Sequence, residues 1–237
     1  MLSIKDLTVE ADGKEILNDI NLEIRDTEKV VLFGPNGCGK STLFKLVMGL
    51  GDYKIKKGSI EIDGKGIKNK SVDDRVKLGL GYIGQKSVGI KGLTLDTLMK
   101  QYDFKYDEIK KDVSELNITE FLDRDINYSL SGGEVKRVEL FTLSLLKNIN
   151  TYLFDELDSG VDIENIERIS KYINRVSKER SIVLTTHTGS ILKHIDVDTA
   201  YVMLKGKIIC KGNPKKVWEC ITNEGYEKCV NCDSRVK

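Results

Sequence analysis

The chain has 237 residues, of which 40% are hydrophobic and 32% are charged, a composition typical of one large globular domain and not of a disordered or fibrous protein. Its 38 basic and 37 acidic side chains leave a formal net charge of +1, which gives no electrostatic reason to expect nucleic acid as a partner. No apolar run approaches the roughly 18 residues of a membrane span, and five cysteines at irregular spacing do not form a disulfide framework. We therefore expect a soluble, cytoplasmic protein without direct membrane insertion.

Short β-rich runs alternate with helical stretches along the chain, which indicates an α/β layered fold. Two of the later runs, at 151–154 and 182–186, are continuously apolar, as is typical of strands covered on both faces. The stretch from about 93 to 146 is predicted to be mostly helical and interrupts the strands. The predicted strands cover residues 3–7, 22–24, 29–33, 59–62, 151–154 and 182–186, and predicted helices cover 40–48 and 163–177.

A glycine-rich segment lies between the strand at 29–33 and the helix at 40–48. It reads GPNGCGKS and matches in full the phosphate-binding pattern G-x-x-x-x-G-K-[ST]. Glycines let the backbone point its N–H groups at phosphate oxygens, and the helix N-terminus adds its dipole. Lys40 is predicted to reach the β- and γ-phosphates of ATP, and Ser41 to coordinate Mg²⁺. The expected nucleotide-binding residues of this loop are Gly34, Pro35, Asn36, Gly37, Cys38, Gly39, Lys40, Ser41 and Thr42.

Two carboxylates, Asp155 and Glu156, end the apolar run at 151–154. Ligands of open α/β sheets bind at the carboxyl ends of the strands. Asp155 is predicted to hold Mg²⁺ directly or through water, and Glu156 to polarise the water that attacks the γ-phosphate. An Asp-Glu pair alone is equally compatible with a solvated strand end that has no function. The phosphate-binding loop in the same chain favours the functional interpretation.

The segment Ser131-Gly132-Gly133-Glu134 follows a leucine within the helical stretch. Ser131 and Glu134 fit the S-x-x-E capping box of a helix start. Capping does not require two consecutive glycines, which weaken the first helical turn. Because glycine has no side chain, two glycines at a helix N-terminus let a phosphate approach the backbone N–H groups closely. Because the segment lies in the helical stretch, we expect Ser131, Gly132, Gly133 and Glu134 to bind the nucleotide of a second subunit.

Gln85 and His187 each end an apolar run. The Gln85 amide is predicted to bridge Mg²⁺ and the helical stretch, and the His187 imidazole to contact the γ-phosphate and the attacking water. Ordinary surface or strand-end roles are the alternatives. The loop at 157–162 is predicted to communicate between subunits. The predicted catalytic residues are Glu156, His187, Gln85 and Lys40, and the predicted metal ligands are Ser41, Gln85 and Asp155.

The cysteines give two further expectations. Cys38 lies beside a helix N-terminus and Lys40, and both would lower the pKa of its thiol and raise its reactivity, although an inert small side chain is the alternative. Cys229 and Cys232 have C-x-x-C spacing, but a tetrahedral site needs four ligands, and only Cys210 and Cys220 could join them. We therefore expect no metal at the C-terminal pair.

The order of these motifs resembles that of the ATP-binding-cassette (ABC) ATPases over nearly the whole chain. The resemblance implies an α/β P-loop NTPase fold with an inserted helical subdomain and an antiparallel β subdomain. It implies one domain over 1–237, with a nucleotide-binding core at about 1–90 and 149–237 and the helical subdomain at about 91–148. It also implies hydrolysis of MgATP to ADP and phosphate in an ATP-dependent homodimer, in which residues 131–134 of one subunit close over ATP held by Lys40 of the other.

Within this family, the chain is most similar to the SufC-type ATPases of the SUF iron–sulfur cluster assembly system. The residues that carry this likeness are LSIKDL at 2–7, GDY at 51–53, DSGVDI at 158–163 and EGY at 224–226. Thr188 and the residues after Glu134 depart from the usual SufC pattern. The likeness implies a SufB- or SufD-like scaffold protein as partner, docked around residues 85–100. The ATP-binding subunit of a membrane ABC transporter shares the catalytic motifs and is the alternative.

Overall fold

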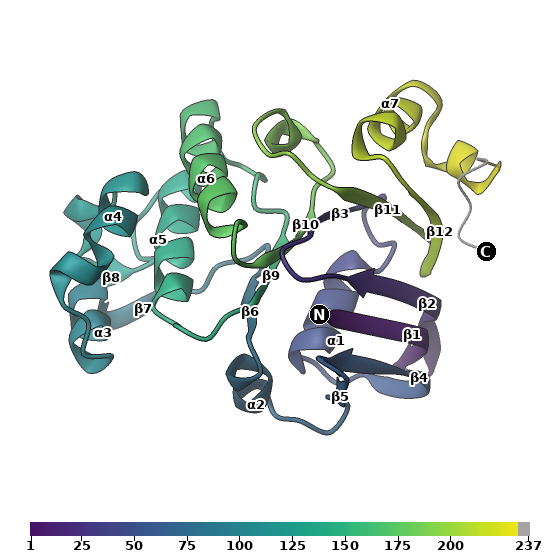
Figure 1. Cartoon of the computed structure of the whole chain (residues 1–237), viewed down its shortest axis with the longest axis horizontal. Coiled ribbons are helices and arrows are strands. Elements are labelled where there is room, and N and C mark those ends of the chain that lie inside the picture. The colour runs from purple at the N-terminus through teal and green to yellow at the C-terminus, as the bar shows by residue number, and fades with distance from the viewer. Residues whose placement is uncertain (232–237) are drawn as a thin grey trace.

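The computed structural model describes residues 1–231, and a six-stranded sheet runs through its centre (Figure 1). The strand order is β12-β11-β3-β10-β9-β6, and neighbouring strands pair in parallel except for the antiparallel pair β11–β12. The strands are β3 (Lys29–Phe33), β6 (Leu80–Ile83), β9 (Thr151–Asp155), β10 (Ser181–Thr185), β11 (Thr199–Leu204) and β12 (Lys207–Gly212).

A second sheet is antiparallel, with the order β2-β1-β4-β5. Helix α1 (Lys40–Met48) packs with this sheet and with the central sheet into one hydrophobic core, through Leu43, Phe44 and Val47. The strands are β1 (Leu2–Ala11), β2 (Lys14–Ile24), β4 (Lys54–Ile62) and β5 (Lys65–Gly66).

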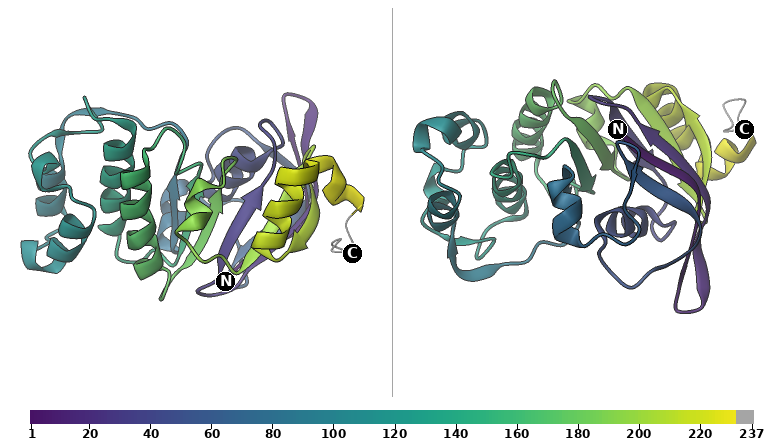
Figure 2. Two further views of the ribbon diagram at one scale, coloured as in Figure 1. Left: turned by 90° about the horizontal axis from the view of Figure 1, so that it is seen from above. Right: turned by 60° about the horizontal axis from the view of Figure 1, so that its bottom comes forward.

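Helices α3, α4 and α5 lie together at the end of the molecule opposite the antiparallel sheet, beside the two-stranded sheet β7–β8 (Figures 1 and 2). Arg175 of α6 ties this end to the centre, because it makes ion pairs with Asp112 and Glu115 of α4 at 2.5 and 2.6 Å. The remaining elements are α2 (Val72–Lys77), β7 (Ile90–Thr94), α3 (Leu95–Gln101), α4 (Tyr106–Glu115), β8 (Asp125–Ile126), α5 (Gly132–Ser144), α6 (Ile163–Val176) and α7 (Pro214–Glu224). Short 3₁₀ turns cover Thr119–Phe121, Ser190–Lys193 and Tyr226–Asn231.

The inner strands β3, β9 and β10 are apolar along most of their length because both faces of their sheet are covered. On β3, Val30 and Leu32 join the core that contains α1, whereas Val31 and Phe33 join a second core with residues of α5 and α6. Side chains alternate between the faces of a strand, so a strand buried on both sides is apolar at most positions instead of at every second one. The α/β fold class predicted from these runs is confirmed.

Three strands are longer than predicted. The strand expected at 59–62 is β4, which begins earlier and spans Lys54–Ile62. The sequence indicated strands at 3–7 and 22–24, whereas β1 and β2 span Leu2–Ala11 and Lys14–Ile24. Both carry exposed polar side chains between buried apolar ones, together with register shifts, and these hide the alternation from a sequence pattern. Within residues 1–231, no helix has the length and apolar character needed to cross a membrane.

Candidate nucleotide-binding site

The glycine-rich loop joins β3 to α1 at the carboxyl edge of the central sheet. Gly39 has φ of 115°, and a Cβ atom there would lie 2.8 Å from Leu17 Cδ2. At Gly34 a Cβ atom would lie 2.4 Å from the Met203 carbonyl oxygen. Because two other strands approach this closely, the loop can follow its path only with glycine at both positions.

Lys40 begins α1 and points its ammonium group back into the loop. Its side chain is buried, and Nζ donates hydrogen bonds to the carbonyl oxygens of Gly34 at 2.6 Å and Pro35 at 3.2 Å. The positive charge is therefore held among the backbone groups of the loop, where it can attract a phosphate.

Three of the predicted catalytic residues meet at one carboxylate. Glu156 is buried, and its Oε2 accepts a hydrogen bond from Gln85 Nε2 at 2.7 Å, while its Oε1 lies 3.4 Å from His187 Nδ1. The Glu156 backbone has φ of 54°, and its N–H donates to Thr185 Oγ1 at 2.9 Å. A non-glycine residue in the left-handed region is strained, and such strain clusters at functional sites. A carboxylate held in this way can orient a water molecule and accept its proton.

Asp155 lies at the end of β9 with both carboxylate oxygens engaged. Oδ1 accepts a hydrogen bond from Thr185 Oγ1 at 2.9 Å, and Oδ2 lies 3.5 Å from the Tyr82 hydroxyl. Burial and the negative charge of Asp155 raise the pKa of Tyr82, so the phenol remains a neutral donor. Thr185 and Tyr82 are not among the residues predicted for the site, because both are ordinary strand formers in apolar runs. The parallel register pairs Thr185 with Asp155, and this pairing could have indicated the contact.

A cavity of 330 Å³ lies between the glycine-rich loop and Glu156. Its lining supplies backbone N–H groups, hydroxyls, amides, an ammonium and a carboxylate, a donor set that suits a nucleotide triphosphate and Mg²⁺, which typically binds through few protein oxygens and the phosphates. The residues that line it are Asn36, Gly37, Gly39, Lys40, Ser41, Thr42, Gln85 and Glu156.

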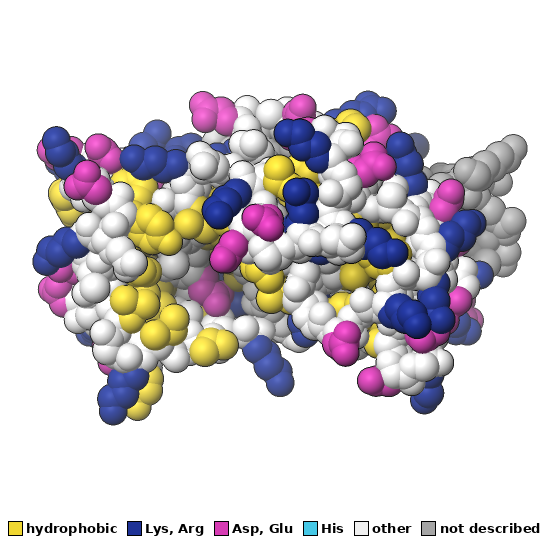
Figure 3. Space-filling model, turned by 90° about the horizontal axis from the view of Figure 1, so that it is seen from below, with side chains coloured by type: hydrophobic (Ala, Val, Ile, Leu, Met, Phe, Trp, Pro, Cys, Tyr) yellow, Lys and Arg dark blue, Asp and Glu magenta, His cyan; other side chains and the backbone are white. Residues whose placement is uncertain are grey.

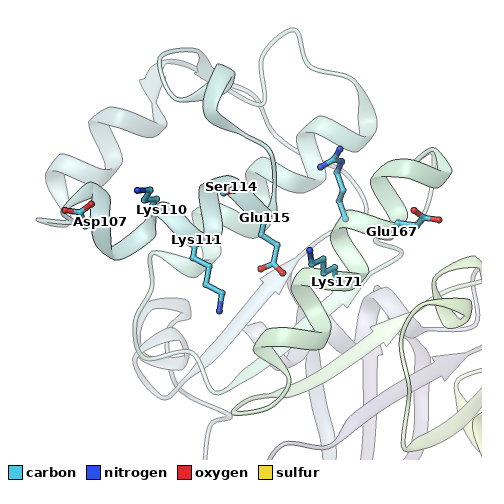
Figure 4. A pocket seen from close by; sticks show the side chains of 8 residues that line it. Asp107, Lys110, Lys111, Ser114, Glu115, Glu167 and Lys171 are labelled. Carbon is cyan, nitrogen blue, oxygen red and sulfur yellow. The ribbon is translucent and has the colours of Figure 1, made fainter.

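A larger cavity, of 760 Å³, lies between α4 and α6 (Figure 4). Charged side chains of both helices, among them Lys110, Lys111 and Lys171, line it together with acidic ones. No predicted site residue is part of its lining, so size alone does not locate the nucleotide site.

The segment Ser131–Glu134 forms the predicted capping box at the start of α5. The Ser131 N–H donates to Glu134 Oε2 at 2.7 Å, and the Glu134 N–H donates to Ser131 Oγ at 3.4 Å. A Cβ atom at Gly133 would lie 2.5 Å from Asn165 Nδ2, so the chain's own helix α6 already excludes a side chain there. None of the four residues lines the 330 Å³ cavity, and the structure does not bring them to Lys40 of the same chain.

The expected lowering of the Cys38 thiol pKa is wrong, and the expected reactivity of this thiol stays a prediction. Cys38 is buried, and burial raises the pKa of its thiol although Lys40 acts in the opposite direction. The helix N-terminus and the lysine were visible in the sequence, but the packing that removes water was not.

Of the C-terminal pair, Cys229 is buried and Cys232 lies outside the described residues, so the expectation of no metal there stays a prediction.

Comparison with known proteins supports what this geometry indicates. Residues 17–159 match the family model described as "ABC transporter". The chain belongs to this family of ABC ATPases. It therefore binds ATP, and its enzymatic activity is ATP hydrolysis.

Relatives match along nearly their whole length. "Vegetative protein 296" of Bacillus subtilis is 36% identical over 95% of this chain and 92% of its own length, and the "Probable ATP-dependent transporter ycf16" of Antithamnion sp. is 37% identical over 90% and 91%. An uncharacterized ABC transporter ATP-binding protein of Methanocaldococcus jannaschii is 31% identical over 100% and 96%.

Solved structures share the fold. An ATP-binding subunit of an ABC transporter superimposes with a TM-score of 0.81 at 23% identity, over 97% of this ABC ATPase and 99% of that chain. A dimeric ATP-binding cassette in a post-hydrolysis state, bound to ADP and phosphate, superimposes with a TM-score of 0.74 at 22% identity, over 90% and 98%. The predicted P-loop ABC ATPase fold is thereby confirmed.

Proposed function

We propose that this ABC ATPase binds and hydrolyses MgATP in a sandwich homodimer and thereby drives a conformational change in an iron–sulfur cluster assembly scaffold. The observation that carries the hydrolysis step is the meeting of Gln85 and His187 at Glu156, beside the cavity of the glycine-rich loop. We also propose that residues of about 91–148 act as a helical subdomain of one nucleotide-binding domain.

Each site residue has a role in this proposal. Lys40 and the N–H groups of the loop bind the phosphates, and Glu156 orients the attacking water with His187 beside it. Ser41, Asp155 and Gln85 would hold Mg²⁺, which when bound neutralises charge on the phosphate oxygens. Asp155 keeps its orientation through Thr185.

The dimer follows from the separation of two motifs. Ser131–Glu134 stands away from the cavity of its own chain, and Ser131 and Gly132 are exposed. In the proposed dimer these residues close over the nucleotide held by Lys40 of a second copy. The solved dimeric cassette with ADP and phosphate shows that the shared fold can assemble in pairs.

The proposed partner is a SufB- or SufD-like scaffold protein in the cytoplasm. Support comes from the SufC-like residues at 158–163 and 224–226. The expected docking surface around residues 85–100 carries exposed apolar side chains, with Val88 74% and Ile90 45% exposed, and Tyr128 lies beside them at 53%. On the face drawn in Figure 3, hydrophobic side chains gather at the end of the molecule that carries α3, α4 and α5. Apolar patches of this kind mark interaction sites.

The ATP-binding subunit of a membrane transporter is the second candidate. The observation in its favour is that relatives carry transporter names. One is called a probable ATP-dependent transporter, and another an ABC transporter ATP-binding protein. The catalytic motifs are common to both functions, so the partner decides between them.

Co-purification tests the partner directly. The tagged chain is expressed in its native host, cross-linked, and recovered separately from the aqueous and membrane fractions. We expect a SufB- or SufD-like scaffold to co-purify. Val88→Asp should abolish this, whereas Lys65→Asp, at an exposed position of β5 in the antiparallel sheet, should preserve it. Recovery of a multi-span permease without any scaffold would replace this proposal with the transporter function.

A further inference from the structure

Three hydroxyl groups surround one carboxylate oxygen next to the catalytic cluster. Asp158 is buried two residues after Glu156, and its Oδ2 accepts hydrogen bonds from Thr186 Oγ1 at 2.7 Å, Thr188 Oγ1 at 2.7 Å and Ser190 Oγ at 2.9 Å. Hydrogen bonds to an ionised acceptor are stronger than those between neutral groups. The loop after β9 is therefore tied at one atom to a segment that lies 28 to 32 residues further along the chain.

The three hydroxyls belong to the segment 186–190, here called the histidine loop, which contains His187. Internal bonds close this loop, because the Gly189 N–H donates to Thr186 Oγ1 at 3.0 Å and the Ser190 N–H donates to Thr188 Oγ1 at 3.3 Å. On its outer side Gly189 packs so tightly that a Cβ atom would lie 2.3 Å from the Trp218 ring. The loop is thus held between Trp218 and Asp158.

His187 has less support than its neighbours. Its side chain is 37% exposed, and within residues 1–231 its imidazole makes one polar contact, the 3.4 Å approach of Nδ1 to Glu156 Oε1. The orientation of the imidazole therefore depends on the backbone on either side of it, and both flanking residues, Thr186 and Thr188, donate to Asp158.

We propose that Asp158 is a positioning residue that fixes the histidine loop and so holds His187 beside Glu156. The inference rests on the proposed roles of Glu156 and His187 in hydrolysis. A carboxylate is needed because one oxygen must accept three donors, whereas an amide oxygen attracts them less strongly. The ordinary alternative is that Asp158 merely stabilises the fold, in which case its loss lowers stability without a specific effect on His187.

The first measurement is made without nucleotide, so it does not depend on the proposed function. The chain has two histidines, His187 and His194, and their imidazole signals can be followed separately by NMR at constant pH. In Asp158→Asn, the chemical shifts of His187 should change while those of His194 stay as in the unchanged chain. Unaltered His187 signals would overturn the inference.

The second measurement is ATP turnover. Asp158→Asn should lower kcat by about tenfold or more, with KM changed by less than about threefold, because the loss falls on the hydrolysis step. Asp158→Asn combined with His187→Ala should be no slower than His187→Ala alone, since both changes remove one function. A further tenfold loss in the double variant would show that Asp158 does not act through His187.

A matched pair at Thr188 covers the case in which Asp158→Asn fails to fold. Thr188→Val removes the hydroxyl, whereas Thr188→Ser keeps it, so the valine variant should show the altered His187 signals and slower turnover and the serine variant should not. Asp196→Asn, at an exposed carboxylate near the same loop, should match the unchanged chain. Equal behaviour of the valine and serine variants would contradict the inference, whereas normal turnover in Glu156→Gln would contradict the proposed function instead.

Discussion

Glu156 is the residue on which the proposed chemistry depends. It leaves β9 with a left-handed backbone, and its carboxylate reaches both Gln85 and His187. Glu156→Gln keeps the size of the side chain and an oxygen for Gln85 to bond, but removes the base. We expect kcat to fall by about 10²-fold or more while ATP affinity is retained.

The measurement is steady-state ATPase activity together with equilibrium ATP binding. Glu219→Gln, at an exposed carboxylate on α7, is the control and should hydrolyse ATP at the unchanged rate. Turnover of Glu156→Gln close to that of the unchanged chain would remove Glu156 from its assigned role.

The sequence predicted individual candidate site residues more readily than the contacts between them. Lys40 and Glu156 stand in patterns that few other functions require, and Gln85 and His187 were placed by the strands they end. The convergence of Gln85 and His187 on one carboxylate depends on side-chain packing, which no pattern records. The same reason explains the error at Cys38, where burial outweighs the neighbouring positive charge.

At the scale of elements, helix α5 begins at a capping box whose strength depends on charge. In the folded chain the pKa of Glu134 lies below its usual 4.5, because the Ser131 N–H donates to the carboxylate. Ionised Glu134 therefore contributes stability above the unfolded-state pKa, and this contribution is lost as pH falls through the lower folded-state pKa.

Urea unfolding of the nucleotide-free chain checks this contribution. The unchanged chain should be more stable than Glu134→Gln at about pH 6, because the ionised carboxylate accepts the stronger hydrogen bond. The difference should shrink as the pH approaches about 3. Glu219→Gln should show no such pH-dependent difference, and a gap between the unchanged chain and Glu134→Gln that stays constant with pH would contradict the argument.

Elements with simple patterns were predicted well. The strand at 29–33 and the helix at 40–48 coincide with β3 and α1. The strand is marked in the sequence by a continuous apolar run, and the start of the helix by the glycine-rich segment before it. The lengths of β1 and β2 were underestimated, since exposed residues and register shifts interrupt their alternation. Gly133 was expected to be glycine so that a phosphate could approach. That its close packing against α6 also excludes a side chain could be seen only in the tertiary structure.

At the scale of the whole molecule, the chain separates the two halves of the expected site. The glycine-rich loop leads into α1, which packs between the two large sheets, whereas Ser131–Glu134 begins α5 at the end that carries α3 and α4 (Figure 1). Within one chain, the glycine-rich loop lacks a second segment to close over its nucleotide, and Ser131–Glu134 has no nucleotide to bind. Two copies arranged head to tail would complete both sites at once.

Light scattering of Glu156→Gln with and without MgATP tests this account most directly. Without nucleotide the chain of 26.7 kDa should be mainly monomeric. With saturating MgATP its mass should double, because the bound γ-phosphate completes the contacts with Ser131–Glu134 of the second copy and is not hydrolysed. Lys40→Ala in the same background should remain a monomer. A monomer of Glu156→Gln at saturating MgATP, even with the scaffold protein added, would contradict the sandwich dimer.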